Sequence, residues 1–434
     1  MTGMSYLMKN MLTTKKPQYT SYQIRLIIFL SVATFFEGYD FIALIQVLPQ
    51  LTKEMAMDEG STGLMIGIIN IGTILSFLII YLADKIGRRP VLTITIIGYT
   101  LASLITGFAG SLWAFVIVQV FARIFLLGEV AVSLIYAAEE FPAERRGRVI
   151  GLLQVSATFG VIFCAGITPT LLATELGWRA VYFVGALPLI LVAFARRNLK
   201  ETKRFEESKS ETISQRFGIF LDLIRGPYRQ RIILMASIWA LTYLCVQVVI
   251  VFWNLYATQS LGLSLETVSR CVMIAALGSI PLIFGVGRLI ELGRRRAAIV
   301  VYTLLIMGAI GCYNLENITL VTISLTISIF AITGVVPILN AYTVELFPTA
   351  MRANAFALCN SLLGRLGYVA SPPLVGWLAI TYGYGAAVTA TVIFPMIALF
   401  LIITRLPETA GMSLEQTSKI QSKDETQGME GETS

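Results

Sequence analysis

Histidine is absent from the sequence, and charged residues and cysteine are scarce. The missing histidine excludes a Ser-His-Asp triad, a histidine-ligated metal and a histidine pH switch. Only 14% of the residues are charged, against roughly 25% in soluble proteins, which also excludes a soluble globular enzyme. The five cysteines stand singly in apolar stretches without a C-x-x-C pair, which favours small buried side chains over a metal or redox site.

Hydrophobic residues, in contrast, make up 56% of the 434 residues. They form twelve long stretches, and a bilayer core of about 30 Å needs roughly 20 apolar residues per helix. The sequence therefore predicts an all-α membrane protein with twelve transmembrane helices. The expected spans are 24–49, 62–82, 91–110, 112–138, 147–172, 178–197, 232–257, 268–290, 297–313, 318–344, 353–379 and 385–405.

Lys and Arg are unevenly distributed between these stretches. With the N-terminus inside, 28 of the 33 basic residues fall on or next to the inner side, three fall on or next to the outer side and two lie deep within spans. Because basic residues mark the cytoplasmic side, both termini are expected to be cytoplasmic. The expected domains are a six-helix bundle (1–197), a cytoplasmic linker (198–231), a second six-helix bundle (232–405) and a disordered cytoplasmic tail (406–434).

Four short motifs occur twice along the chain at almost constant spacing. The second copy follows the first by 206 positions in three cases and by 207 in the last. A parallel repeat of this kind predicts two pseudo-symmetric six-helix bundles. The pairs are Gly87-Arg88-Arg89 with Gly293-Arg294-Arg295, Glu139 and Arg146 with Glu345 and Arg352, Phe141-Pro142 with Phe347-Pro348, and Lys200-Glu201-Thr202 with Pro407-Glu408-Thr409.

At these motifs the sequence resembles the major facilitator superfamily of secondary transporters, over the whole chain. Residues 82–89 are similar to the superfamily signature between helices two and three, although Ile80 stands where the signature prefers glycine and Ile290 replaces the aspartate in the second copy. Glu139, Glu345 and the Glu-Thr elements resemble signatures of sugar porters and their organic-ion relatives. The resemblance implies alternating access between two bundles, without enzyme activity.

Charges at the predicted cytoplasmic helix ends are candidates for a gate. They could pair across the two bundles when the inside is closed and separate on opening, which would bias a two-state rocking motion. The alternative is that they only fix topology and helix ends. The expected gate residues are Asp84, Arg88, Arg89, Glu139, Arg146, Arg294, Glu345 and Arg352.

Five ionisable residues lie deep within the predicted spans: Glu37, Asp40, Arg123, Glu129 and Arg365. A charge at mid-membrane costs about 2.5–3.5 kcal/mol on the insertion scale, so functional roles are expected. Glu37 and Asp40 lie three positions apart on one helix face, where two carboxylates in a low dielectric suit a proton carrier. We expect Asp40, supported by Glu37 and Glu129, to couple protons. A static ion pair with Arg123 is the alternative.

The stretch Glu37-Gly38-Tyr39-Asp40 resembles the Asp-Gly-aromatic-Asp element of aromatic acid:proton symporters. Asp40 matches this element, and Glu37 matches only in charge. The resemblance also implies an arginine in the fourth helix, where Arg123 stands. A guanidinium holds a carboxylate through two parallel hydrogen bonds, so Arg123 is expected to bind an anionic substrate or to respond to the proton on Asp40.

Other polar and aromatic residues of the spans are expected to complete the binding site. Gln154 and Asn360 are amides at the repeat offset of 206, which fits a pocket between the bundles. The seventh stretch lacks the Gln-Gln-Leu-Ser element of hexose porters, which counts against a sugar. The expected binding residues are Arg123, Tyr39, Gln154, Gln247, Trp253, Asn254, Asn360 and Arg365.

These observations favour a proton-coupled symporter of a small organic anion, an aromatic or other carboxylic acid. A monomer in the inner (plasma) membrane is expected, with the bilayer, protons and a small molecule as partners, and without nucleic acid, metal or cofactor. One alternative is a proton antiporter that exports drugs or cationic or amphipathic metabolites, against which the two mid-span arginines argue. Another is a membrane sensor that has lost transport. An intramembrane enzyme would lack a nucleophile–base pair.

Overall fold

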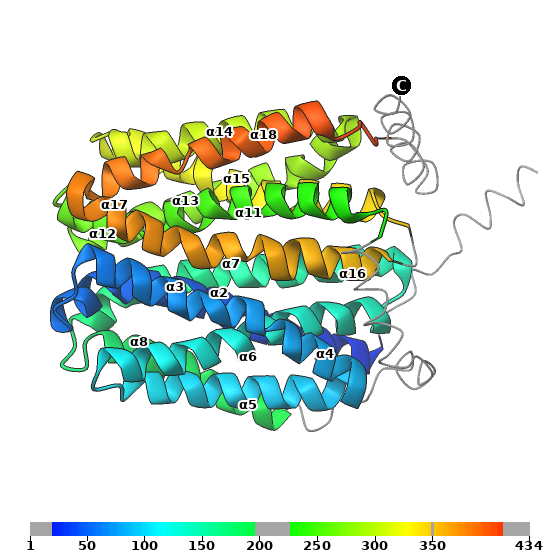
Figure 1. Cartoon of the computed structure of the whole chain (residues 1–434). Coiled ribbons are helices and arrows are strands. Elements are labelled where there is room, and N and C mark those ends of the chain that lie inside the picture. The colour runs from blue at the N-terminus through cyan, green and yellow to red at the C-terminus, as the bar shows by residue number, and fades with distance from the viewer. Residues whose placement is uncertain (1–19, 196–225, 349–350, 411–434) are drawn as a thin grey trace, which may run out of the picture.

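The computed structural model describes residues 20–195, 226–348 and 351–410, and these residues form helices and no strand. The helices run nearly parallel to one long axis in two groups, blue to teal and green to red in Figure 1. The first turn of α2 and the last turn of α18 lie at the same end of the bundle, on the right in Figure 1. We call this the terminal end. Most of the predicted linker and tail lies outside the described residues.

The six expected spans of the first half all lie on helices. The second of them is broken at Ser76, whose hydroxyl donates a 2.7 Å hydrogen bond to the carbonyl oxygen of Thr73, a back-bond that bends helices. The helices are α2 (Ser21–Glu54), α3 (Glu59–Leu75), α4 (Phe77–Ile86), α5 (Arg88–Gly107), α6 (Leu112–Glu140), α7 (Ala143–Leu172) and α8 (Trp178–Ala195).

The second half repeats this order with more interruptions. The expected seventh span is broken at Phe252, and Gly383, with φ of 73°, interrupts α17 between the expected eleventh and twelfth spans. The elements are α11 (Arg229–Val251), α12 (Trp253–Gln259), α13 (Leu265–Leu292), α14 (Arg294–Asn314), α15 (Ile318–Glu345), α16 (Arg352–Phe356), the π-helix η2 (Ala357–Gly364), α17 (Leu366–Ala390) and α18 (Ile393–Arg405).

Ten helical segments among the described residues are long and apolar enough to cross a membrane. One of them, Asn354–Arg405, is 52 residues long and contains both of the last two expected spans. Many large apolar side chains on these helices face outward, such as Trp377 and Phe400 at 68% and 63% exposure. An outward-facing apolar surface together with a packed interior is what a bilayer-embedded helix bundle requires.

Equivalent glycines begin equivalent helices in the two halves. Gly87 precedes α5 and Gly293 precedes α14, with φ of 108° and 153°. Positive φ strains residues that carry a Cβ atom, which accounts for glycine at both positions. The repeat seen in the sequence is therefore also a repeat of local backbone conformation.

Close packing of α2 against α7 fixes the position of the first-helix acids. A Cβ atom built on Gly38 would lie 1.9 Å from the carbonyl oxygen of Ala157, and one on Gly160 would lie 1.8 Å from that of Phe35. Two glycines thus let the two backbones touch. Gly38, between Glu37 and Asp40, is therefore required for the packing of α2 against α7.

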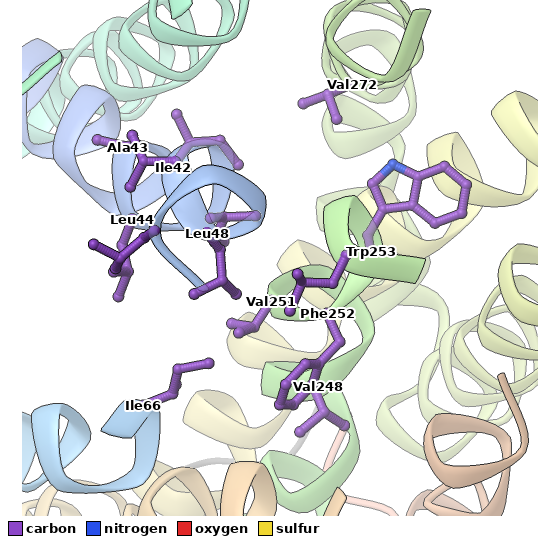
Figure 2. Close-up of a cluster of buried hydrophobic side chains, with 14 of the residues drawn as sticks. Ile42, Ala43, Leu44, Leu48, Ile66, Val248, Val251, Phe252, Trp253 and Val272 are labelled. Atoms are coloured by element: carbon purple, nitrogen blue, oxygen red, sulfur yellow. The ribbon is translucent and has the colours of Figure 1, made fainter. Parts of the chain in front are cut away.

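The two halves meet mainly where α3 packs against α17, α7 against α13 and α2 against α12, and α3 also contacts η2. Figure 2 shows the apolar seam, with Leu48 of α2 and Ile66 of α3 facing Val251 and its neighbours from the second half. A Cβ atom on Gly63 of α3 would lie 2.3 Å from the carbonyl oxygen of Pro372. The end of the bundle opposite the terminal end is therefore closed in this conformation.

Candidate functional site

Asp40 lies inside the first half and is only 5% exposed. The charge of Arg123 on α6 acts on it, and Tyr99 and Ser103 of α5 lie beside it. Among the described residues, no ion pair within 4 Å joins Asp40 to Arg123. The carboxyl group thus lies among polar side chains without a direct salt bridge, an arrangement that would allow it to gain and lose a proton.

Glu129 forms a second buried acid site on α6. It follows Arg123 on the same helix and lies one to two turns closer to the terminal end. It is 5% exposed and accepts hydrogen bonds from Thr95 and, at 3.1 Å, from Ser133. Glu37 of α2 is half-buried and close enough to Glu129 for their charges to interact. The three predicted carboxylates therefore form two neighbouring acid sites along the first half.

One face of α5 supplies the polar partners of both acid sites, and the sequence reasoning missed it. Thr95, Tyr99 and Ser103 are all buried, at 0%, 3% and 1% exposure. Thr95 contacts Glu129, while Tyr99 and Ser103 lie beside Asp40. Residues four apart share one helix face, so this spacing within the third span was a signal that could have revealed them.

Two arginines from different halves converge on the same turn of α3. A Cβ atom built on Gly72 would lie 2.9 Å from the Cβ atom of Arg123. Arg365 from the second half donates a 2.8 Å hydrogen bond from Nη1 to the carbonyl oxygen of Thr73, the next residue. Neither guanidinium lies within 4 Å of a carboxylate oxygen in the described part of the chain. The Cβ atom of Arg123 and the guanidinium of Arg365 therefore lie against the same turn of α3, one from each half.

Aromatic and amide side chains surround Arg365. The rings of Tyr243 and Tyr368 meet edge to face at 4.4 Å, and the hydroxyl of Tyr243 donates to Oδ1 of Asn360 at 2.8 Å. The charges of both arginines act on Tyr368, and Arg365 also acts on Tyr243. Asn360 lies within η2, and π-helical turns often occur at functional sites. The structure thus joins predicted Asn360 and Arg365 to two tyrosines of the predicted spans.

Five other predicted binding residues are not brought into this group. Tyr39 is 1% exposed and donates a 2.8 Å hydrogen bond to the carbonyl oxygen of Val181, deep in the first half. Trp253 packs edge to face against Tyr313 at 6.2 Å, also in the core. The remaining three differ in exposure: Asn254 and Gln247 are buried, and Gln154 is exposed.

Asn254 instead closes the seam at the end opposite the terminal end. Its Nδ2 donates a 2.8 Å hydrogen bond to Oε1 of Gln46, from the other half, and both residues are fully buried. The hydroxyl of Ser269 on α13 reaches the same oxygen at 3.4 Å. Gln46 was not singled out from the sequence, because one amide in an apolar helix does not reveal its partner.

The predicted gate residues form a cluster in each half at the terminal end. Arg88 pairs with Asp84 at 3.1 Å and with Glu139 at 3.0 Å, and Arg294 pairs with Glu345 at 2.8 Å. The matching Arg88–Glu139 and Arg294–Glu345 pairs follow the sequence repeat. Arg89 is exposed, Arg352 is half-buried, and the side chain of Arg146 lies outside the described part of the structure.

Glu408 completes the second cluster. Its carboxylate accepts hydrogen bonds from the backbone N–H groups of Arg294 and Arg295, at 2.8 and 3.0 Å, and so caps α14. Burial alone would raise the pKa of Glu408, but the backbone hydrogen bonds outweigh burial and hold the pKa below its usual value. The neighbouring Thr409 donates a hydrogen bond to Glu345. The repeated Glu-Thr element thus ties the end of the second half to its basic helix start.

Comparison with known proteins matches this architecture over most of the chain. A family model described as Major Facilitator Superfamily matches residues 30–364 and 235–426. The sialic acid transporter NanX of Escherichia coli is 24% identical over 393 residues, covering 86% of this chain and 91% of that protein. The niacin transporter NiaP of Acinetobacter baylyi is 23% identical over 404 residues, covering 85% and 90%. The crystal structure of a D-xylose-proton symporter superposes with a TM-score of 0.73 at 18% identity, covering 91% of this chain and all of that one.

Proposed function

The chain belongs to the Major Facilitator Superfamily, and from that premise we propose that it is a proton-coupled symporter of a small organic anion. It is a multi-pass integral membrane protein whose relatives and fold are those of transporters rather than enzymes. The observation that carries the proposal is the convergence of Arg123 and Arg365, one from each half, on one turn of α3.

An anion between these arginines would resolve an electrostatic cost. Each cation within a span is expensive, about 2.5–3.5 kcal/mol on the insertion scale, and neither arginine has a carboxylate partner within 4 Å among the described residues. A bound carboxylate would accept paired N–H bonds from a guanidinium. Because the two arginines belong to different halves, a bound anion would also favour the halves approaching each other, as alternating access requires.

The relatives support a carboxylic acid as the substrate class. Two of these relatives are described as transporters of sialic acid and of niacin, and both compounds are carboxylic acids. The rings of Tyr243 and Tyr368 beside Arg365 offer an apolar, aromatic surface next to the anion site. We therefore place Arg123, Arg365, Asn360, Tyr243 and Tyr368 at the substrate. From its buried contacts, Tyr39 acts in packing.

Proton coupling is assigned to Asp40, with Glu37 and Glu129 between it and the terminal end. In this mechanism, protonation of Asp40 weakens its hold on Arg123, whose guanidinium then becomes available to the substrate. The hydroxyls of Thr95, Tyr99 and Ser103 hold the carboxyl groups in place. Each transported anion would thus be accompanied by at least one proton.

The proposed topology has twelve spans with both termini in the cytoplasm. The segment Asn354–Arg405 would cross twice, turning near Gly383, and α8 would supply the sixth crossing. The bundles would be 1–197 and 232–405, joined by the cytoplasmic linker 198–231 and followed by the cytoplasmic tail 406–434. The terminal end is then cytoplasmic, and a monomer in the inner membrane would suffice for transport.

The charged clusters of the terminal end are proposed to latch the cytoplasmic side. In the present conformation, Arg88 pairs with Asp84 and Glu139, and Arg294 pairs with Glu345, each within its own half. When the inside closes, the halves would approach and these charges, with Arg89, Arg146 and Arg352, would exchange partners across the seam. Such pairs are individually weak at a wet surface, so the latch would work as a network.

Export of cations by proton antiport is the second candidate, because buried acids such as Asp40 and Glu129 could face a cation directly. Uptake by proteoliposomes separates the two functions. For the anion symporter, labelled nicotinate or benzoate enters faster when the outside is acidic, and a protonophore abolishes the stimulation. Proton-driven exchange of a cationic dye, with no acid uptake under any gradient, would establish the antiporter instead.

A further inference from the structure

A groove separate from the anion site runs along the seam between α7 and α13. Its middle part, with a volume of about 590 Å³, is lined by apolar side chains such as Phe159, Phe163 and Met273. Its second part, of about 610 Å³, continues past Thr170 to the beginning of α13. Both volumes fall in the range of small-molecule sites, roughly 300–1,000 Å³.

The groove opens away from the closed interior, toward the bilayer. Phe159 and Phe163 are 51% and 45% exposed on a membrane-spanning helix. The Gln46–Asn254 contact closes the seam at this end, while the groove continues past it to the exposed Arg270. An elongated apolar groove at this depth matches the acyl chain of a lipid, which is the solvent available there.

Opposite charges stand at the mouth of the groove. Arg270 and Glu266 form an ion pair through one guanidinium nitrogen and one carboxylate oxygen, with side-chain exposures of 70% and 65%. Neither side chain has a further partner among the described residues, so N–H groups of Arg270 and the second oxygen of Glu266 remain available. This arrangement complements a headgroup that carries a phosphate beside a primary ammonium group.

The groove also adjoins the Gln46–Asn254 contact that closes the seam between the halves. Ser269 lines it and donates a hydrogen bond of 3.4 Å to Gln46, the residue that bonds Asn254. The groove walls come from different halves, so its shape changes whenever the halves rock. A molecule that fits the groove in this conformation therefore stabilises the conformation in which Gln46 and Asn254 are hydrogen-bonded.

We propose that the groove between α7 and α13 binds one aminophospholipid, with an acyl chain along Phe159 and Phe163, its phosphate on Arg270 and its ammonium on Glu266. The site is independent of the transported substrate. Bound lipid favours the conformation in which Gln46 and Asn254 are joined. In the proposed topology this lipid belongs to the outer leaflet.

The test is lipid binding to the purified, delipidated full-length protein, measured by native mass spectrometry with phosphatidylethanolamine, phosphatidylcholine and phosphatidylglycerol. Gly166→Leu fills the groove, since a Cβ atom there already lies 3.3 Å from Sδ of Met273. Gly151→Leu, on the same helix with nothing within 4 Å of its Cβ position, is the matched control. Thr170→Leu, at an exposed position, blocks the groove if Gly166→Leu does not fold.

One tightly held phosphatidylethanolamine is expected on the wild type and on Gly151→Leu, and none on the blocked variants. Glu266→Gln should remove the preference for the ethanolamine over the choline headgroup, and Arg270→Gln should weaken both roughly tenfold, the effect of one charge-assisted hydrogen bond. Unchanged retention by the blocked variants, or tightest binding of phosphatidylglycerol, would overturn the proposal.

Discussion

Arg365 and Thr73 join the two halves of the molecule by a 2.8 Å hydrogen bond from a guanidinium Nη1 to a backbone carbonyl oxygen. A carbonyl oxygen carries no net charge, so this bond positions Arg365 without neutralising it. The remaining N–H groups stay available for an anion next to Tyr368.

Replacing Arg365 by Gln should raise the KM for anion uptake roughly ten- to a hundredfold, because hydrogen bonds to charged groups are worth about 1.5–3 kcal/mol each. Arg365→Lys should recover part of the loss, since it keeps the charge but not the paired N–H groups. Initial rates of labelled nicotinate uptake in proteoliposomes measure both. An unchanged KM in Arg365→Gln would remove this residue from the substrate site.

Asp40→Asn should abolish proton-driven accumulation while leaving substrate exchange between the two faces of the vesicle, because the amide mimics the protonated acid. Counterflow and gradient-driven uptake, measured side by side, distinguish the two activities. Asp58→Asn serves as control, since Asp58 is a surface residue that caps α3 by accepting a 2.8 Å hydrogen bond from the N–H of Ser61. Equal accumulation by Asp40→Asn and wild type would contradict the proton assignment.

Gly63→Leu should prevent closure of the seam opposite the terminal end. The Cβ position at Gly63 lies 2.3 Å from the carbonyl oxygen of Pro372 and 2.9 Å from Cα of Gly376, which are backbone atoms that cannot give way locally. The protein should accumulate with this face open, which spin-label distances between α3 and α17 would show as a longer separation. Distances identical to wild type would mean that the close approach is dispensable.

Gln46→Leu and Asn254→Leu should each destabilise the protein, and the double variant should lose less than the sum. Each single change leaves a buried amide without its partner, at a cost of about 1–3 kcal/mol, whereas the double change removes both polar groups. Thermal unfolding of the four proteins in one detergent completes the cycle. Strict additivity would show that the 2.8 Å contact contributes nothing.

Glu408→Gln should lower stability at neutral pH by about 1 kcal/mol or less, the scale of a solvent-screened helix cap. Because folding holds the pKa of Glu408 below its usual 4.5, its contribution is present above that value and fades as the pH falls through the lowered pKa. The melting temperatures of variant and wild type should therefore differ at pH 7 and converge in acid. A difference that grows on acidification would contradict the cap.

The helical fold and the terminal charge clusters follow from patterns that a sequence displays directly. Apolar length identified the helices, and the repeat related Arg88 and Glu139 to Arg294 and Glu345, but the pairing of these residues within each half was not predicted. The intramembrane acids and arginines stand out because charge is costly in lipid. All of these signals are local in the chain or repeat at a fixed offset.

Other site features depend on which way a helix faces, and that is decided by tertiary packing. Tyr39 sits in the acid motif yet turns into the core toward Val181. Gln154 and Asn360 are related by the repeat, but only Asn360 is buried beside Tyr243. Pseudo-symmetry predicts equivalent backbone positions, whereas the packing around each position decides whether its side chain is buried.

The π-helix η2 lies in the stretch where the repeat shows a small irregularity. Motifs before it recur at 206 positions, whereas the Glu-Thr element after it recurs at 207. A π-turn accommodates one additional residue without ending the helix, and each added residue rotates everything beyond it by about 100°. The π-turn directly before Arg365 is therefore one place where the second half can hold one residue more than the first, and such an addition would turn Arg365 relative to its counterpart.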